Sequence, residues 1–361
     1  MIIAEGSITA LYLFDVAEEA DLAALPRLLQ AQASPARLAP KPFTPAYVQY
    51  QQPPIVLDGE ALQLPGLSPQ MRVRVKVFDY GVISFALTQP VSGNWDDLAT
   101  AGQRLGALEA QVQGWCDRLR TQLAPGLVKS RPPLLSEDYL IYAVTRLEPA
   151  APASTLIATE GDAIVSLLLG ERQPLSRQQR TRVLRRQISY LADDLVIPTW
   201  NASFVYDTEA GVQAALEIFE FANSQLLQFR YYDALLDSEL ERIYDSLETP
   251  RWYHALTGQR YVRAARQLHA LFIDVNELTD KTENALKMVG DVYAARLFSL
   301  VAGRLGLDRW KQNVEEKLDT LDDIYRFTVD QTQMSRGHLL ELTIILILIL
   351  ELILVFMGIM E

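Results

Sequence analysis

Arginine is the residue type whose number and spacing first suggest chemistry in this chain. Six arginines fall in the 15 residues from 172 to 186, although the whole chain carries 33 Lys and Arg against 45 Asp and Glu. On a helix beginning after Ser176, one broad face carries Arg182, Arg185 and Arg186 and, less closely, Arg177 and Arg180. The possible phosphate contacts among them are Arg177, Arg182, Arg185 and Arg186. Such a face suits the phosphates of RNA or of anionic lipid head groups. The alternative is pairing with the chain's own carboxylates, such as Asp193 and Asp194, and the ordinary behaviour of surface charge favours it.

A second chemical signal is a carboxylate inside an apolar run near the C-terminus. Residues 342–360 hold no charge except Glu351, which lies at their middle. An ionised carboxylate at the centre of a bilayer costs roughly 2.5–3.5 kcal/mol on insertion scales, so it should be protonated, paired or turned toward protein. We therefore interpret Glu351 and Glu341 as the polar positions of a membrane segment and expect copies of the chain to associate through Glu351. The alternatives are a pore lined by Glu351 and a protonated carboxyl without a role.

Patterns typical of enzymes and metal sites are missing from the sequence. None of the three histidines belongs to a recognisable motif with a nucleophilic residue. The sequence contains no P-loop, Gly-x-Ser-x-Gly, His-Glu-x-x-His or Gly-x-Gly-x-x-Gly motif. The single cysteine, Cys116, stands beside Trp115 on an amphipathic stretch and is expected to be a packed thiol. We therefore predict no enzyme activity, no catalytic residue, no cofactor and no metal site.

The N-terminal part that carries the arginines reads as a mixture of strands and helices. Strict alternation predicts strands over 72–88, with Gly81 at a turn or bulge, and apolar residues three and four apart predict a helix over 98–123. Short apolar runs at 139–147 and 163–169 are interpreted as two further strands. Together these elements predict an α+β domain, ferredoxin-like and mixed, over residues 1–208.

The remaining chain predicts helices and then a membrane anchor. Apolar stripes predict a helical domain over 209–338 that contains a long antiparallel hairpin with a heptad-like, coiled-coil seam. Residues 339–361 predict one C-terminal transmembrane helix, since the apolar positions 342–360 give a helix of roughly 28 Å against a hydrocarbon thickness of ~30 Å. A buried core helix is the alternative for this segment.

Several features predict where the protein resides. The N-terminus lacks the basic start and small-residue cleavage site of a signal peptide. Arg326 and Arg336 lie on the N-terminal side of the predicted span, as the positive-inside rule requires of a cytoplasmic side. We therefore expect a tail-anchored, single-pass protein of a bacterial inner membrane, with its N-terminal bulk cytoplasmic and its C-terminus across the bilayer. A single cysteine agrees with a reducing compartment.

Four features occur in order along the chain: the FDYGVISF strand, the run at 164–169 before a long helix, two long helices, and the segment LLELTIILILILELILVF. In this order they resemble the YagE-like "required for meiotic nuclear division" family, also known as domain of unknown function 155. The matching residues are Phe78, Tyr80, Gly81, Val82, Leu340, Glu341, Ile344, Ile345 and Glu351. The run from Asp194 to Asp207 departs from the family pattern. The resemblance implies a single-anchor membrane protein that acts as a scaffold or tether, with mitochondrial members supporting organellar translation.

A weaker, architectural likeness links the chain to CorA-type magnesium channels, which also join an α/β domain to long helices and a C-terminal membrane part. The second span and the Gly-Met-Asn loop of that family are missing. The sequence therefore predicts a non-enzymatic, oligomeric scaffold or tether. The alternative is an oligomeric ion channel or transport assembly lined by Glu351 and fed by carboxylates of the predicted helical stalk.

The expected partners are membrane lipid, further copies of the chain, and a protein at the cytoplasmic face. Nucleic acid is not expected, because the net charge is −12 and no RNA-binding signature interleaves aromatic residues with the arginines.

Overall fold

The computed structural model describes residues 1–29, 53–58, 64, 66, 69–133, 135–248, 273, 275–276, 292–324, 326, 344–345 and 347–349. The chain divides into two compact units. Unit 1 comprises Met1–Tyr231 and Asp280–Trp310, and unit 2 comprises Tyr232–Thr279 and Lys311–Glu361. The division of the chain at 208 and 338 expected from the sequence stays a prediction.

Unit 1 is built on a seven-stranded sheet whose order is β3-β4-β5-β1-β7-β9-β8. The strands are β1 (Ile2–Asp15), β3 (Ile55–Asp58), β4 (Arg72–Val77), β5 (Val82–Gly93), β7 (Ser136–Glu148), β8 (Leu195–Pro198) and β9 (Ala202–Tyr206). Neighbouring strands are antiparallel except for β7 and β9, which are parallel. Smaller elements are β2 (Glu19–Ala20), which pairs with β6 (Leu127–Val128), the helix α1 (Leu25–Leu29) and the 3-10 turn η1 (Ala124–Gly126).

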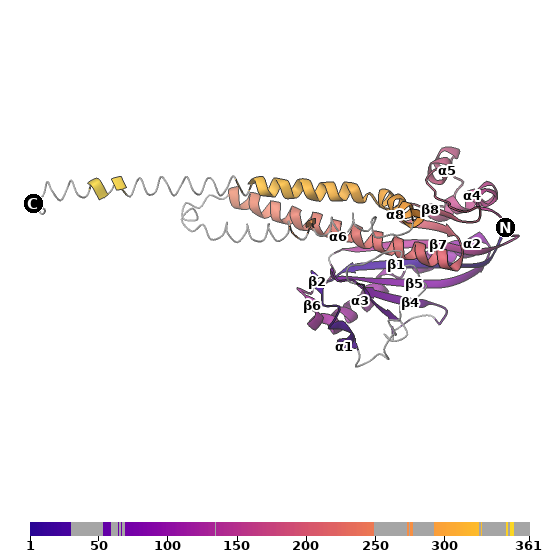
Figure 1. Ribbon diagram of the computed structural model, residues 1–361, viewed down its shortest axis with the longest axis horizontal. Helices are drawn as coiled ribbons and strands as arrows, with labels where there is room; N and C mark the ends of the chain where they lie inside the picture. Colours follow the sequence, from indigo (N-terminus) through magenta and orange to yellow (C-terminus); the bar gives the residue numbers. More distant parts are fainter. Residues whose placement is uncertain are drawn as a thin grey trace, which may run out of the picture. The chain divides into compact units, whose positions relative to one another are not determined.

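One face of this sheet packs against α2 (Trp95–Gly106), α3 (Glu109–Leu123) and α4 (Ala153–Leu169). The strand β1 turns Ile8, Ala10, Tyr12 and Phe14 toward this face, and all four are buried. The helix α2 begins at a capping box, in which the Asn94 side chain accepts a hydrogen bond from the Asp97 N–H and the Asp97 carboxylate accepts one from the Asn94 N–H, each 2.9 Å long. Figure 1 shows α3 on this side of the sheet.

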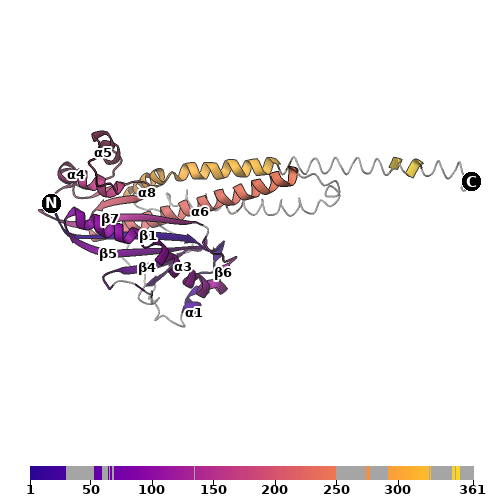
Figure 2. The ribbon, with the colours of Figure 1, turned by 180° about the vertical axis from the view of Figure 1, so that it is seen from behind.

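The opposite face of the sheet is covered by α6 (Glu209–Glu248), which belongs to unit 1 as far as Tyr231. The Phe219 ring stacks on the Tyr139 ring of β7, with centroids 5.3 Å apart. The next aromatic residue of α6, Phe221, contacts Phe298 of α8 (Val292–Leu305), with centroids 5.7 Å apart. Figures 1 and 2 show α6 along the sheet on the side away from α3. Because both faces are covered, the middle of β1 is apolar at nearly every position.

The helical segment predicted at 98–123 is present as two helices, α2 and α3, separated at Ala107 and Leu108. The alternation at 72–88 is confirmed as β4 and β5, joined by a turn in which Gly81 has a φ of +74°. The strand predicted at 163–169 is wrong, because these residues form the end of α4, which stops at the left-handed Gly170. A short apolar run fits a buried helix as well as a strand, and the buried residues Leu156, Ile164 and Leu168 follow the helical spacing.

Two parts of the predicted fold class are corrected. The N-terminal part is mixed α+β, but its described sheet has seven strands and is not the four-stranded ferredoxin-like arrangement. The C-terminal transmembrane helix is not supported either. Among the described residues, no helix combines the length and the apolar character that crossing a membrane requires. The single-pass membrane localisation inferred from that helix is corrected with it.

Crossing a bilayer takes about 20 residues of continuous helix, which apolar composition predicts but does not establish. Of the segment 339–361, the structure describes only Ile344, Ile345 and Ile347–Ile349, which are helical and exposed. Glu341 and Glu351 lie outside the described residues, as does most of the predicted hairpin between 249 and 291.

Candidate anion-binding site

The arginine-rich segment contains a short helix, α5 (Arg177–Leu184), whose position is set by α4. Ser176 caps α5 by accepting a hydrogen bond from the Gln179 N–H, 3.2 Å long. The buried side chain on α5 is Val183, and Gly161 of α4 allows the close approach of α5. A Cβ at Gly161 would lie 3.0 Å from Arg180 Nη2, which is tighter than ordinary contact. The two helices therefore pack along the Arg180 side of α5.

This packing separates Arg180 from the other arginines of the segment. Arg180 Nε lies 3.1 Å from Asp162 Oδ1 of α4 and forms an ion pair with it. Arg172 donates to Gln103 Oε1 at 2.8 Å. The remaining arginines line an open pocket of about 790 Å³. Its lining residues are Arg177, Gln178, Thr181, Arg182, Arg185, Arg186, Gly303 and Arg304.

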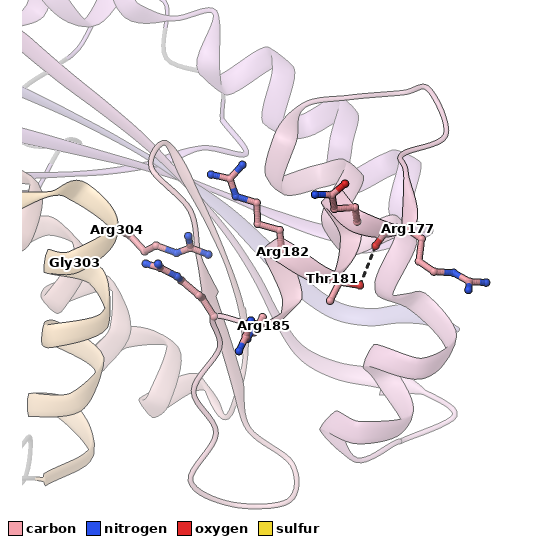
Figure 3. A pocket seen from close by; sticks show the side chains of 8 residues that line it. Arg177, Thr181, Arg182, Arg185, Gly303 and Arg304 are labelled. Carbon is pink, nitrogen blue, oxygen red and sulfur yellow. Dashed lines mark hydrogen bonds between the residues drawn. The ribbon is translucent and has the colours of Figure 1, made fainter.

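The pocket is closed on its other side by α8, which contributes Gly303 and Arg304. Figure 3 shows the Arg182 and Arg304 side chains extending into the space between α5 and α8, while Arg177 points away on the far side of α5. Thr181 donates its hydroxyl to the Arg177 carbonyl oxygen at 2.9 Å, so it is engaged within the helix. The strongest concentration of charge therefore lies between Arg182, the Arg185–Arg186 pair and Arg304.

The arginines of the pocket are not neutralised by the parts of the chain that the structure describes. Within those parts, no carboxylate oxygen lies within 4.0 Å of the side-chain nitrogens of Arg177, Arg182, Arg185, Arg186 or Arg304. Asp194, a partner considered from the sequence, instead accepts hydrogen bonds from the N–H groups of Tyr190 and Leu191 at 2.7 and 2.6 Å. The sequence therefore provides a nearby acid in Asp194, but the fold directs its carboxylate to the backbone of its own turn.

Arg304 is the most constrained member of the pocket. Its Nε is buried and has no hydrogen-bond partner among the described residues. Burial lowers the pKa of Arg304 from its ordinary value, and the positive charges of Arg186 and Arg182 lower it further, while Tyr139 acts in the opposite direction. A guanidinium under these conditions gains from a bound anion, which supplies both an acceptor and a compensating charge.

The chemistry that this arrangement supports is anion binding. Guanidinium groups are planar, remain charged and donate two parallel hydrogen bonds to a phosphate or carboxylate. The lining contains arginine, glutamine, threonine and glycine, and among these described residues there is no carboxylate, imidazole or thiol positioned to act as a base or nucleophile. Groups of His, Cys, Asp and Glu suited to a metal ion do not occur among the described residues.

The structure thus brings all four arginines predicted from the sequence, Arg177, Arg182, Arg185 and Arg186, to one pocket. No sequence pattern pointed to Arg304 or Gly303, because they lie on a distant helix that reaches α5 only through tertiary packing. The packed thiol is confirmed, since Cys116 is buried and burial raises its pKa.

Comparison with known proteins gives one family. The family model described as "Uncharacterized protein MJ0711, N-terminal domain" matches residues 5–213, more than half of the chain. Uncharacterized protein MJ0711 of Methanocaldococcus jannaschii is 26% identical over 218 residues, which is 60% of this chain and 65% of that protein. The match therefore spans just under two thirds of the relative's length. No solved structure matches the chain.

These findings correct the resemblance to the YagE-like family, which is wrong. The FDYGVISF strand and the apolar C-terminal segment consist largely of aromatic and aliphatic residues, which unrelated strands and helices share. The matched region, 5–213, includes α5 and the sheet except for the first three residues of β1, whereas Arg304 lies beyond it.

Proposed function

The chain belongs to the family of the uncharacterized protein MJ0711, N-terminal domain, and we propose that it is a non-enzymatic binding protein that holds a phosphate-bearing ligand in the pocket between α5 and α8. The observation that carries the proposal is the absence, among the described residues, of any carboxylate paired with the arginines of that pocket. The chain as a whole has a net charge of −12, so the positive charge of this pocket is a local feature and does not follow from the overall composition.

Binding without turnover is favoured by the chemistry of the lining. Arginines stabilise an anion and fix its orientation, while the described lining provides no base and no nucleophile. This supports a role as a scaffold whose assembly or partner contacts depend on an anionic ligand. The alternative of a channel stays a prediction, since Glu351, which would line its pore, lies outside the described residues.

The proposal is tested by isothermal titration of pyrophosphate into the full-length chain and two variants, Arg182→Gln and Arg304→Gln. Each substitution removes one charged donor, and hydrogen bonds to charged groups contribute about 1.5–3 kcal/mol. We therefore expect the affinity to fall about 10-fold to 100-fold in each variant. A ligand bound only by the folded state also raises its melting temperature, which gives a second readout.

The matched control is Arg146→Gln, which removes the same charge from β7 outside the pocket. Arg146 is 57% exposed and pairs with Glu5 at 2.8 Å. The affinity of the Arg146→Gln variant for pyrophosphate should stay within about twofold of that of the unsubstituted chain, because the removed charge is distant from the pocket and screened. Equal losses in all three variants, or no binding to the unsubstituted chain, would contradict the proposal.

A further inference from the structure

The arginine pocket has an aromatic neighbour. Tyr190 follows Arg186 by four residues, and its ring packs against Tyr293 of α8 with centroids 5.8 Å apart and planes at 54°. Tyr190 is nevertheless 69% exposed. A large ring that is held on one side and open on the other is suited to stacking against a flat ligand.

The turn that carries Tyr190 is well fixed. Ile188 and Val196 exchange two backbone hydrogen bonds, of 3.0 and 2.9 Å. The carboxylate of Asp194, itself 5% exposed, accepts from the Tyr190 and Leu191 N–H groups. The exposure of Tyr190 is therefore a property of an ordered turn, and the ring is available to a ligand without rearrangement.

Two segments join the basic and the aromatic ends of this region. On α8, Tyr293 and Arg304 are eleven residues apart, which is about 16 Å along the axis and within roughly 20° of the same helix face. On the other segment, the four residues from Arg186 to Tyr190 span at most about 14 Å. The segments come together at both ends, since Tyr190 contacts Tyr293 and since Arg186 and Arg304 line the same pocket. The basic end and the aromatic end therefore lie within the reach of one elongated small molecule.

We infer that the ligand of this site is a nucleoside polyphosphate, with its phosphates among Arg182, Arg186 and Arg304 and its base against Tyr190. The inference rests on the proposed function and names the ligand class for the same site. Several unneutralised arginines exceed what one orthophosphate can pair, so two or more linked phosphates fit the charge better. An aromatic side chain stacks on any nucleobase, which supplies the second contact.

The experiment compares ATP, tripolyphosphate and orthophosphate by isothermal titration with the full-length chain. Stacking of a base on one aromatic residue contributes about 1–3 kcal/mol, so ATP should bind at least about fivefold more tightly than tripolyphosphate. Orthophosphate should bind most weakly. In the variant Tyr190→Ala, the advantage of ATP should disappear while the affinity for tripolyphosphate stays the same. The control Trp200→Ala removes another exposed ring, 72% accessible, from the turn between β8 and β9 and should change neither affinity.

The outcomes separate this inference from the proposal on which it rests. Equal affinities for ATP and tripolyphosphate, or an unchanged ATP advantage in Tyr190→Ala, would overturn the nucleotide and leave the anion site intact. Tighter binding of a single-stranded oligonucleotide lacking a 5′-triphosphate than of ATP would also overturn it. Failure of every phosphate compound to bind would overturn the proposed function itself.

Discussion

Replacing Glu220 with glutamine should strongly destabilise unit 1, because it removes one charge from a buried ionic cluster between α6 and the sheet. Glu220 is fully buried, and its Oε2 lies 2.7 Å from Lys76 Nζ and 3.5 Å from Arg74 Nη2. Its Oε1 accepts a hydrogen bond from Ser84 at 2.6 Å. Burial by itself raises the pKa of Glu220, but the charges of Lys76 and Arg74 outweigh it and hold the pKa below its ordinary value. The carboxylate is therefore ionised in the folded chain.

The magnitude follows from what the substitution leaves behind. The introduced amide would keep the volume of the side chain and an acceptor for Ser84, whereas the Lys76 side chain, 6% exposed, would lose its main counter-charge. Removing one partner of a buried pair typically costs about 3–5 kcal/mol. Arg74 is 29% exposed and remains hydrated, so the isolated charge is chiefly that of Lys76. We therefore expect Glu220→Gln to lower the free energy of unfolding by about 3–5 kcal/mol.

The assay is urea unfolding followed by both circular dichroism and tryptophan fluorescence, with agreement between the two probes required before a free energy is derived. The control is Glu5→Gln, the same change in an exposed pair, where Glu5 and Arg146 are 62% and 57% accessible. That variant should lose at most about 1 kcal/mol. The double variant Lys76→Met with Glu220→Leu should be more stable than the sum of the single effects predicts. A loss below about 1 kcal/mol for Glu220→Gln, no larger than that of an exposed pair, would refute the reasoning.

Three further predictions concern single sites in unit 1. Burial raises the pKa of Asp15 to about 6, even though Arg131 opposes the rise, so the folded state binds this proton more tightly than the unfolded state, whose pKa is the ordinary 3.8. Lowering the pH from 7 to 4 should therefore stabilise the unsubstituted chain relative to Asp15→Asn by about 2–2.5 kcal/mol in urea unfolding. An equal pH dependence in the two chains would contradict this. Gly81→Ala should lower the free energy of unfolding by more than about 2 kcal/mol in the same assay, since the residue has a φ of +74° and an added Cβ would lie 2.0 Å from the Ala17 carbonyl oxygen. An unchanged free energy of unfolding would show that the turn can move and would contradict this. Cys116 should resist Ellman's reagent in the folded chain and react fully in urea, because burial shields the thiol and raises its pKa. Rapid labelling without urea would show that the thiol is not buried.

Periodicity in the sequence predicts those elements whose two faces meet different surroundings. Val73, Val75 and Val77 are buried on one face of β4, while Arg74 and Lys76 turn to the other, so the alternation is plain. The end of α4 gives no such contrast, because most of the run AIVSLLL is apolar, and its helix is set by packing on the sheet and by its stop at Gly170.

The arginine pocket could be predicted in part for a similar reason. A helical face from Arg177 to Arg186 follows from local spacing, and the structure contains its first part as α5 (Arg177–Leu184), with Arg185 and Arg186 just after the end of the helix. Local spacing does not predict which arginine forms an ion pair, since the pair between Arg180 and Asp162 depends on the packing of α5 on α4. Arg304 lines the pocket because the chain returns to unit 1 at 280–310, and no short-range sequence pattern predicts that return.

The central claim, that the arginines between α5 and α8 bind a phosphate-bearing ligand, is tested most directly by chemical footprinting of arginines. The full-length chain would be treated with phenylglyoxal, with and without tripolyphosphate, and each modified residue quantified by mass spectrometry. Arg182, Arg185 and Arg186 are exposed and should react readily in the free chain, then become protected when the ligand is present. Arg146, exposed but outside the pocket, should react equally in both samples. Protection that is absent, or that extends equally to Arg146, would contradict the account.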